Sequence, residues 1–126
     1  MGDAKKTSIL VVDDDKNQRG MLEFALVDRG YQVVAVDSGA LAIERAKTEK
    51  FDAAICDIMM PGVNGVAALG QLKRLQPNLK VIMATAYATS ALAAASMKGG
   101  ATGYIAKPYD LKELFAMLDL ALGKGP

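Results

Sequence analysis

Histidine is absent from this 126-residue sequence, and cysteine occurs once. The lack of histidine excludes histidine metal sites, histidine general bases and a phosphohistidine carried by the chain itself. A single cysteine excludes an intrachain disulfide, which is typical of proteins in the reducing cytoplasm, so we expect a cytoplasmic protein. Because Cys56 stands inside an apolar run, we expect it to be a small core residue.

Long hydrophobic runs and an excess of either charge are also missing. No apolar stretch reaches the roughly 20 residues that span a membrane, and the N-terminal segment lacks the apolar core of a signal peptide. The 15 basic and 14 acidic residues leave a formal net charge of +1, and no basic block stands out. We therefore expect no membrane association and no nucleic acid bound by this domain itself.

Apolar residues make up 52% of the chain, enough to fill the core of one domain of this length. Continuous apolar runs alternate with helical patterns along the whole sequence. The predicted strands are 8–12, 32–36, 52–56, 80–84 and 102–105. The predicted helices run over about 17–28, about 39–49, from Asn64 to Pro77, about 89–98, and from Asp110 to Gly123. Asp15 and Asp110 precede helical patterns and are expected to cap them.

Five strand–helix units with short connections predict an α/β fold with a doubly wound, five-stranded parallel sheet. Right-handed crossovers leave few topologies, and the strand order 2-1-3-4-5 is the natural one. The ligand crevice of such a sheet lies beyond the carboxyl ends of its first and third strands, where the winding reverses.

Polar side chains stand at the ends of four predicted strands. Asp13 and Asp14 follow the first strand, and Asp57 follows the third. Thr85 follows the fourth, and Lys107 follows the fifth. Because parallel strands end at the same edge of a sheet, we expect these side chains to form an acidic pocket with a lysine counter-cation. Each like-charge pair within 4–5 Å costs roughly 4 kcal/mol at an effective dielectric constant of about 20, so a bound cation is expected to compensate.

Such a pocket suits a divalent metal and a phosphoryl group. Carboxylate oxygens with room for water favour Mg²⁺, with Mn²⁺ as the alternative. Asp57, on the central strand, is the best nucleophile, because a carboxylate that attacks phosphorus forms an acyl phosphate. Asp13 and Asp14 are the better metal ligands. The Thr85 hydroxyl could bind a phosphoryl oxygen, and Lys107 supplies a second positive charge.

These residues resemble the motif set of the receiver domain of two-component response regulators, the CheY-like superfamily. The matching segments are Val12-Asp13-Asp14, Asp57-Ile58-Met59-Met60-Pro61-Gly62, Thr85-Ala86 and Lys107-Pro108. The resemblance implies a flavodoxin-like fold and a single receiver domain over 1–126, with a core at about 8–122 and a tail or linker stub at 123–126.

The resemblance also implies a chemistry for the acidic pocket. Asp57 would accept a phosphoryl group from the phosphohistidine of a sensor histidine kinase or of a phosphotransfer protein. Asp13 and Asp14 would hold Mg²⁺ together with Asp57, and the Met59 backbone carbonyl would be a further ligand. The domain would catalyse its own phosphorylation and dephosphorylation, and it would not be a kinase.

A conformational switch is implied as well. Thr85 and Lys107 would hold the phosphoryl oxygens, and Tyr104 is similar to the family's switch aromatic, which turns inward when Thr85 moves towards the phosphate. The Lys107–Pro108 peptide bond is usually cis in this family. The first helix would be the kinase-docking face.

The family's output surface would consist of the helix at about 89–98, the strand at 102–105 and the last helix. The first of these helices is rich in alanine, and the last carries Met117, Leu120 and Ala121 beyond its core stripe. One interpretation is a surface suited to a homodimer or to partner docking, and the other is a broadly buried helix pair.

Met59 and Tyr87 flank the pocket with bulky, non-acidic side chains, and neither readily positions a hydrolytic water. The sequence therefore predicts slow self-dephosphorylation. It leaves open whether the receiver acts alone or as the N-terminal part of a longer regulator.

Other functions fit parts of the pattern. A small metal-dependent phosphatase of similar fold would need a second acid two residues after the nucleophile, where Met59 stands. A flavodoxin-like nucleotide binder would need a glycine-rich loop after the first strand. A receiver-like fold without phosphorylation is disfavoured, because every residue that the chemistry needs is present.

Overall fold

The computed structural model describes residues 6–57, 64–86 and 89–123. Strands and helices alternate along the chain in the order β1 (Ser8–Val12), α1 (Lys16–Asp28), β2 (Gln32–Val36), α2 (Gly39–Thr48), β3 (Ala53–Asp57), α3 (Gly65–Leu75), β4 (Lys80–Thr85), α4 (Ser90–Lys98), β5 (Gly103–Ala106) and α5 (Leu111–Ala121). None of the helices in these ranges has the length and apolar character needed to span a bilayer.

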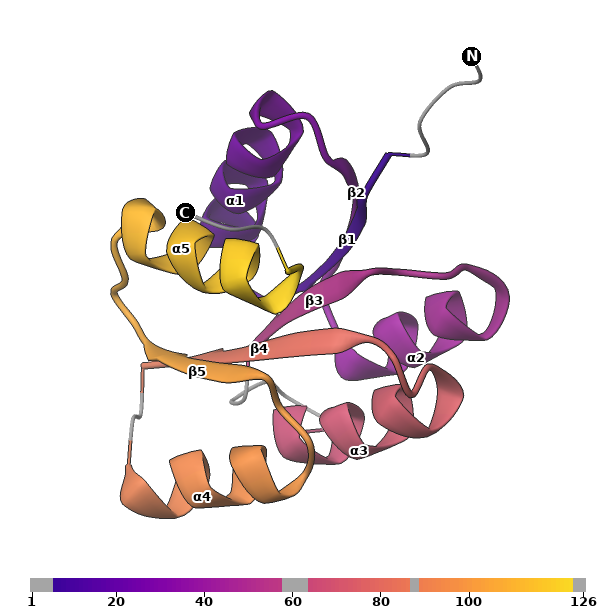
Figure 1. Ribbon diagram of the computed structural model, residues 1–126, viewed down its shortest axis with the longest axis vertical. Coiled ribbons are helices and arrows are strands. Elements are labelled where there is room, and N and C mark those ends of the chain that lie inside the picture. Colours follow the sequence, from indigo (N-terminus) through magenta and orange to yellow (C-terminus); the bar gives the residue numbers. More distant parts are fainter. Residues whose placement is uncertain (1–5, 58–63, 87–88, 124–126) are drawn as a thin grey trace.

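The five strands form one parallel sheet of order β2-β1-β3-β4-β5, which confirms the predicted topology. Helices α1 and α5 cover one face of the sheet, and α2, α3 and α4 cover the other (Figure 1). Because each crossover packs a helix against the sheet, both faces are buried, and the strands can be apolar on both sides.

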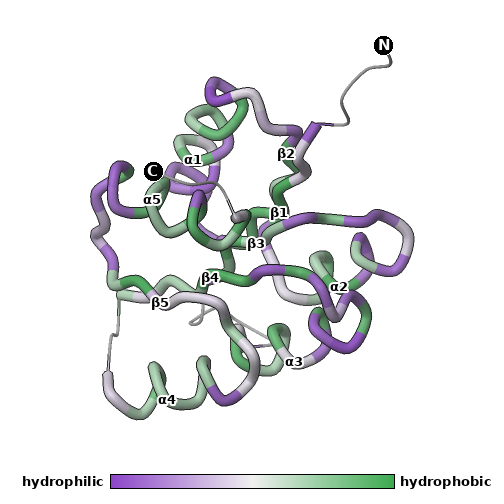
Figure 2. The backbone as a smooth tube through the Cα atoms, viewed as in Figure 1, coloured by the Kyte–Doolittle hydropathy of each residue, from purple (hydrophilic) through white to green (hydrophobic). Residues whose placement is uncertain are grey.

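Two apolar clusters fill the space between the sheet and its helix layers. Alternate residues of a strand point to opposite faces, so Leu10 and Val12 join the cluster under α2 and α3, and Ile9 and Val11 join the one under α1 and α5. Hydrophobic residues are concentrated along the central strands (Figure 2). Cys56 is fully buried in the first cluster, as predicted.

Each helix begins after a residue whose side-chain oxygen accepts a backbone N–H of the first turn. These capping residues are Asp15, Ser38, Asn64, Thr89 and Asp110. Such caps contribute about 1 kcal/mol each, and they set where each loop at the carboxyl edge of the sheet turns into a helix. The two caps expected from the sequence, at Asp15 and Asp110, are confirmed.

Three strands extend further at their carboxyl ends than their apolar runs predict, to Asp57, Thr85 and Ala106. Asp57 still pairs with Ala84, and Thr85 with Ala106, because backbone hydrogen bonding does not depend on side-chain polarity. The helix ends differ from the predicted ones by one or two residues. The extension holds the backbones of Asp57 and Thr85 within the sheet rather than in loops.

Candidate metal centre at the carboxyl edge of the sheet

Two acids and a lysine meet where β1, β3 and β5 end. The Lys107 Nζ donates to Asp13 Oδ2 at 2.8 Å and to Asp57 Oδ2 at 3.0 Å. Asp13 and Asp57 are buried, and the Lys107 side chain is only 10% exposed. The sheet alone brings these residues together, since they lie 94 and 50 positions apart in the sequence.

Asp14 completes an acidic cluster. Asp13, Asp14 and Asp57 each contribute a carboxylate oxygen, and these oxygens all lie within 4.8 Å of one another. Oxygens that share a divalent cation at about 2.0–2.6 Å are separated by roughly 3–5 Å, so the cluster fits such an ion. Asp14 is exposed to solvent, which leaves space for the water ligands that Mg²⁺ retains. Met59, the further ligand predicted by resemblance, lies outside the described residues.

The charges in the pocket compensate one another. Burial is the largest single influence on Lys107 and disfavours its ammonium form, but the hydrogen bonds with Asp13 and Asp57 and the negative charges of these two carboxylates together outweigh it and raise the pKa of Lys107 above its usual value. Burial also raises the pKa of the Cys56 thiol to about 12, and the charges of Asp57 and Asp13 add to this effect. Lys107 therefore stays charged at neutral pH, while Cys56 stays protonated and inert.

Thr85 and Tyr104 lie on the neighbouring strands β4 and β5. Thr85 is fully buried, and its carbonyl accepts the Lys107 backbone N–H at 2.8 Å. Tyr104 pairs with Met83, two residues before Thr85, so the side chains of Thr85 and Tyr104 are on the same face of the sheet. The Tyr104 hydroxyl is buried and has no hydrogen-bond partner among the described residues. The Lys107–Pro108 peptide bond is cis, as expected.

Tyr109 is a neighbour of the pocket to which sequence reasoning assigned no role. Burial raises its pKa, and the charges of Lys107, Asp13 and Asp57 also act on its hydroxyl. With Lys107 it lines a cavity of about 130 Å³ whose other walls are Gln18, Met21 and Pro108. Its position two residues after Lys107 is a signal in the sequence that could have pointed to it.

The sheet order and the acidic cluster define the class of protein, a doubly wound α/β domain built around a carboxylate centre at its carboxyl edge. The family model described as the response regulator receiver domain matches residues 9–119, and the chain belongs to this family. It is thus a receiver domain of the two-component response regulator type, as the sequence motifs predict.

Known relatives agree with this assignment. The transcriptional regulatory protein ZraR of Escherichia coli (strain K12) is 39% identical over 114 residues, which are 90% of this chain and 26% of ZraR. The chain thus spans about a quarter of the length of this curated relative.

Solved structures show the same fold. A response regulator receiver domain protein (CheY-like) from Methanospirillum hungatei JF-1 has a TM-score of 0.92 at 29% identity, covering 94% of this chain and 95% of that one. A response regulator from Burkholderia pseudomallei, solved with a phosphorylated aspartic acid, a calcium ion and citrate, has a TM-score of 0.87 at 30% identity, with coverages of 94% and 69%. A divalent cation and a phosphorylated aspartate therefore occur within this family.

Proposed function

We propose that Asp57 accepts a phosphoryl group from the phosphohistidine of a sensor histidine kinase or of a phosphotransfer protein. The observation that carries this proposal is the contact of Lys107 with both Asp57 and Asp13 at the edge of the sheet. In the transfer, a carboxylate oxygen of Asp57 forms a bond to phosphorus while the donor's N–P bond breaks. The electron pair of that bond returns to the donor imidazole.

The ion expected at this centre is Mg²⁺, with Mn²⁺ as the alternative. Asp13, Asp14 and Asp57 would hold it, with the Met59 carbonyl as a further ligand by family resemblance. When bound, such an ion neutralises negative charge on the carboxylates and the phosphoryl oxygens. The carboxylate spacing of at most 4.8 Å supports this assignment.

Lys107 and Thr85 would hold the transferred group. Lys107 now pairs with the Asp57 carboxylate, and after transfer a phosphoryl oxygen on Asp57 would take the place of that carboxylate oxygen. A shift of Thr85 towards the phosphoryl group would then favour an inward Tyr104. The position of both side chains on one face of adjacent strands supports this coupling.

The switch would act on the surface of α4, β5 and α5, through a homodimer or a docked partner. We also propose that 1–126 is a single receiver domain that works in the cytoplasm, alone or as the N-terminal part of a longer regulator. It would bind no nucleic acid itself, because its formal net charge is only +1. The kinase would dock at α1, where Met21, Phe24 and Val27 are 60%, 75% and 53% exposed.

Phosphorylation by a small donor tests the assignment of Asp57. We expect the wild type to gain an acid-labile adduct of about 80 Da with acetyl phosphate and Mg²⁺, and Asp57→Asn to gain none, because an amide does not form an acyl phosphate. Intact-mass spectrometry measures both. Asp28→Asn, a change in an exposed acid at the far end of α1, should behave as wild type. An adduct of equal yield on Asp57→Asn would contradict the proposal.

The lifetime of the phosphoryl group is a second expectation. The domain would lose it slowly, because neither Met59 nor Tyr87 orients a hydrolytic water. Both residues lie outside the described ranges, so this expectation rests on the sequence. The double variant Met59→Asn/Tyr87→Glu should lose its adduct roughly tenfold faster, since oriented polar groups accelerate attack by water. Intact-mass spectrometry over time measures the loss of the adduct from wild type and from the double variant. Equal rates of loss would contradict the expectation that Met59 and Tyr87 slow the hydrolysis.

A further inference from the structure

The loop between β1 and α1 presents Asp13 and Asp14, and its hydrogen bonds are unusually complete at Asp13. The Asp13 N–H donates to the Val36 carbonyl at 3.1 Å, and Asp13 Oδ1 accepts the Asp15 N–H at 2.9 Å. Its Oδ2 accepts from Lys107. The remaining polar group of Asp13 is the backbone carbonyl.

That carbonyl accepts a hydrogen bond from Arg19, whose Nη1 lies 3.0 Å away. Arg19 stands in the first turn of α1, and its N–H donates to the Asp15 carbonyl at 2.9 Å. Side chains on a helix lean towards its N-terminus, so Arg19 reaches back over the loop that precedes the helix. The helix start, capped by Asp15, thus fixes the base from which the guanidinium reaches.

The Asp13 carbonyl belongs to the peptide unit that joins Asp13 to Asp14. Because a peptide unit is planar, a donor that holds its oxygen also restricts the rotations on either side of it. Those rotations set the direction in which the Asp14 Cα–Cβ bond points. The Asp14 carboxylate makes no hydrogen bond among the described residues, so its direction depends on this backbone.

We propose that Arg19 is a positioning residue, which presents the Asp13–Asp14 pair to a divalent cation by holding the carbonyl between them. This inference rests on the proposed metal centre. In this role Arg19 would act through the Asp13 carbonyl and not by touching the cation or the phosphoryl group. Within the described chain it makes no ion pair with a carboxylate, so its guanidinium acts on the loop through this hydrogen bond.

Positioning and simple electrostatics predict opposite effects of removing Arg19 on the affinity for a divalent cation. Arg19 carries a positive charge beside an acidic cluster, so removing that charge alone should tighten cation binding slightly. If Arg19 positions the loop, removing it should weaken cation binding, because groups that hydrogen-bond metal ligands typically account for 10–100-fold in affinity. The direction of the change therefore separates positioning from charge.

The test measures the Mn²⁺ affinity of the full chain in the absence of a phosphoryl donor. The EPR signal of free Mn²⁺ reports how much of the ion is bound at each point of the titration. Arg19→Met should bind Mn²⁺ about tenfold more weakly than wild type. Arg19→Lys keeps the charge and a donor on a long stem and should restore most of the affinity. Lys16→Met, which removes an exposed cation from the same helical turn, should leave affinity unchanged or slightly tighter.

Circular dichroism melts show whether each variant is folded at the temperature of the titration, and Arg19→Gln serves as the neutral variant if Arg19→Met does not fold. Binding by the neutral variant as tight as wild type overturns the proposal, and so does a lysine variant as weak as the neutral one. A wild type that binds no Mn²⁺ overturns both the metal centre and this inference. If wild type binds Mn²⁺ and the neutral Arg19 variant binds it with the same affinity, the metal centre stands and only the positioning role of Arg19 is overturned.

Discussion

Among single residues, Asp14 carries a charge that should destabilise the metal-free fold but that the proposed metal centre needs. Three carboxylates share the pocket, and Lys107 pairs with those of Asp13 and Asp57. The third carboxylate, on Asp14, adds negative charge to the cluster without forming an ion pair among the described residues. Without a bound cation this charge opposes the folded state, and with one it becomes a ligand.

Replacing Asp14 should therefore stabilise the protein in the absence of metal. We expect Asp14→Asn to raise the melting temperature in EDTA by about 4 °C, which corresponds to about 1 kcal/mol of relieved repulsion. Wild type should melt at a higher temperature in millimolar Mg²⁺ than in EDTA, because the ion binds the folded state, and Asp14→Asn should lose most of this increase. Differential scanning calorimetry measures both effects.

Asp28→Asn is the matched control, since it removes an exposed acid of α1 far from the pocket. It should change neither the melting temperature in EDTA nor the response to Mg²⁺. An Asp14→Asn variant that is less stable than wild type in EDTA would show that the carboxylates do not repel one another in the metal-free fold.

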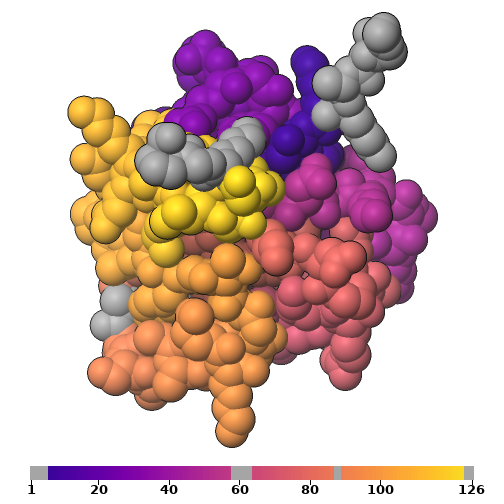
Figure 3. Space-filling view, viewed as in Figure 1, coloured from indigo at the N-terminus to yellow at the C-terminus, as the bar shows by residue number. Residues whose placement is uncertain are grey.

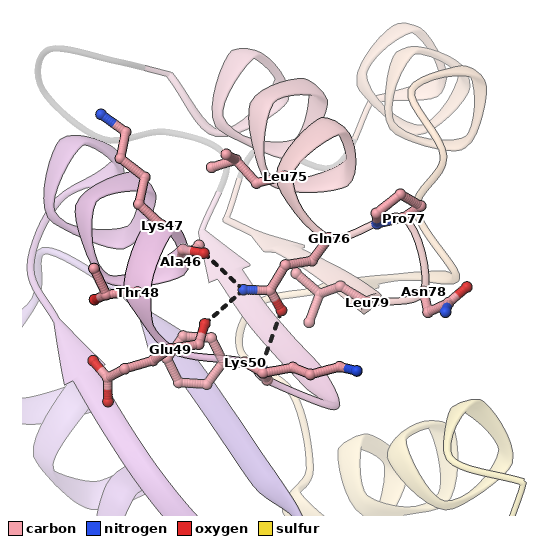
Figure 4. A pocket seen from close by; sticks show the side chains of 11 residues that line it. Ala46, Lys47, Thr48, Glu49, Lys50, Leu75, Gln76, Pro77, Asn78 and Leu79 are labelled. Atoms are coloured by element: carbon pink, nitrogen blue, oxygen red, sulfur yellow. Dashed lines mark hydrogen bonds between the residues drawn. The ribbon is translucent and has the colours of Figure 1, made fainter.

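Among the elements, α2, α3 and β3 are joined by one side chain at the pole opposite the acidic pocket. The Gln76 Nε2 donates to the carbonyls of Ala46 at 2.9 Å and Glu49 at 2.7 Å. Its Oε1 accepts the Phe51 N–H at 3.0 Å (Figure 4). The amide thus satisfies two carbonyls at the end of α2 and the backbone just before β3, in the wall of a surface cavity of about 380 Å³.

Removing this side chain should lower stability without affecting the metal centre. We expect Gln76→Ala to reduce the free energy of unfolding by about 2 kcal/mol, because three backbone groups lose their partner. Gln76→Glu should reduce it further, since the carboxylate keeps the bond to Phe51 but faces two carbonyl oxygens. Urea unfolding measures stability, and Mn²⁺ affinity should remain at the wild-type value. A glutamate variant as stable as wild type would contradict this account of the junction.

In the whole molecule, α4, β5 and α5 form one continuous part of the surface, coloured orange to yellow in Figure 3. Leu120 is 74% exposed and Met97 is 51% exposed, whereas Ser96 is the only described residue of α4 that is buried. The alternative of a broadly buried helix pair is therefore wrong. Of the apolar residues noted on the last helix, Met117 and Ala121 are partly buried, and Leu120 projects into solvent.

Dimerisation through this surface should depend on Leu120. If the surface acts through a homodimer, beryllofluoride with Mg²⁺, which mimics the phosphoryl group, should shift wild type from monomer to dimer in sedimentation velocity, and a wild type that stays monomeric would favour the docked partner. Leu120→Asp should remain monomeric, because a charge replaces an exposed apolar contact, and it should still accept phosphate from acetyl phosphate. Phe24→Asp, which changes a residue of similar exposure on α1, should dimerise as wild type does. Dimers of Leu120→Asp would place the interface elsewhere.

The architecture was predictable because it depends on patterns along the chain. Apolar runs separated by helical periods specify five strand–helix units, and right-handed crossovers leave few ways to order them. Since parallel strands end at one edge, the meeting of Asp13, Asp57 and Lys107 follows from that order. Family motifs then added the chemistry of the pocket and the cis bond at Lys107–Pro108.

Only the tertiary structure decided the interactions between side chains and distant backbone groups. The bonds from Gln76 to the end of α2, and from Arg19 to the Asp13 carbonyl, depend on distances across elements that no local pattern encodes. The exposure of Leu120 likewise depends on how α5 is rotated against the sheet. Sequence periodicity determines which face of an element is buried, whereas the packing of neighbouring elements determines which polar atoms come within hydrogen-bond distance.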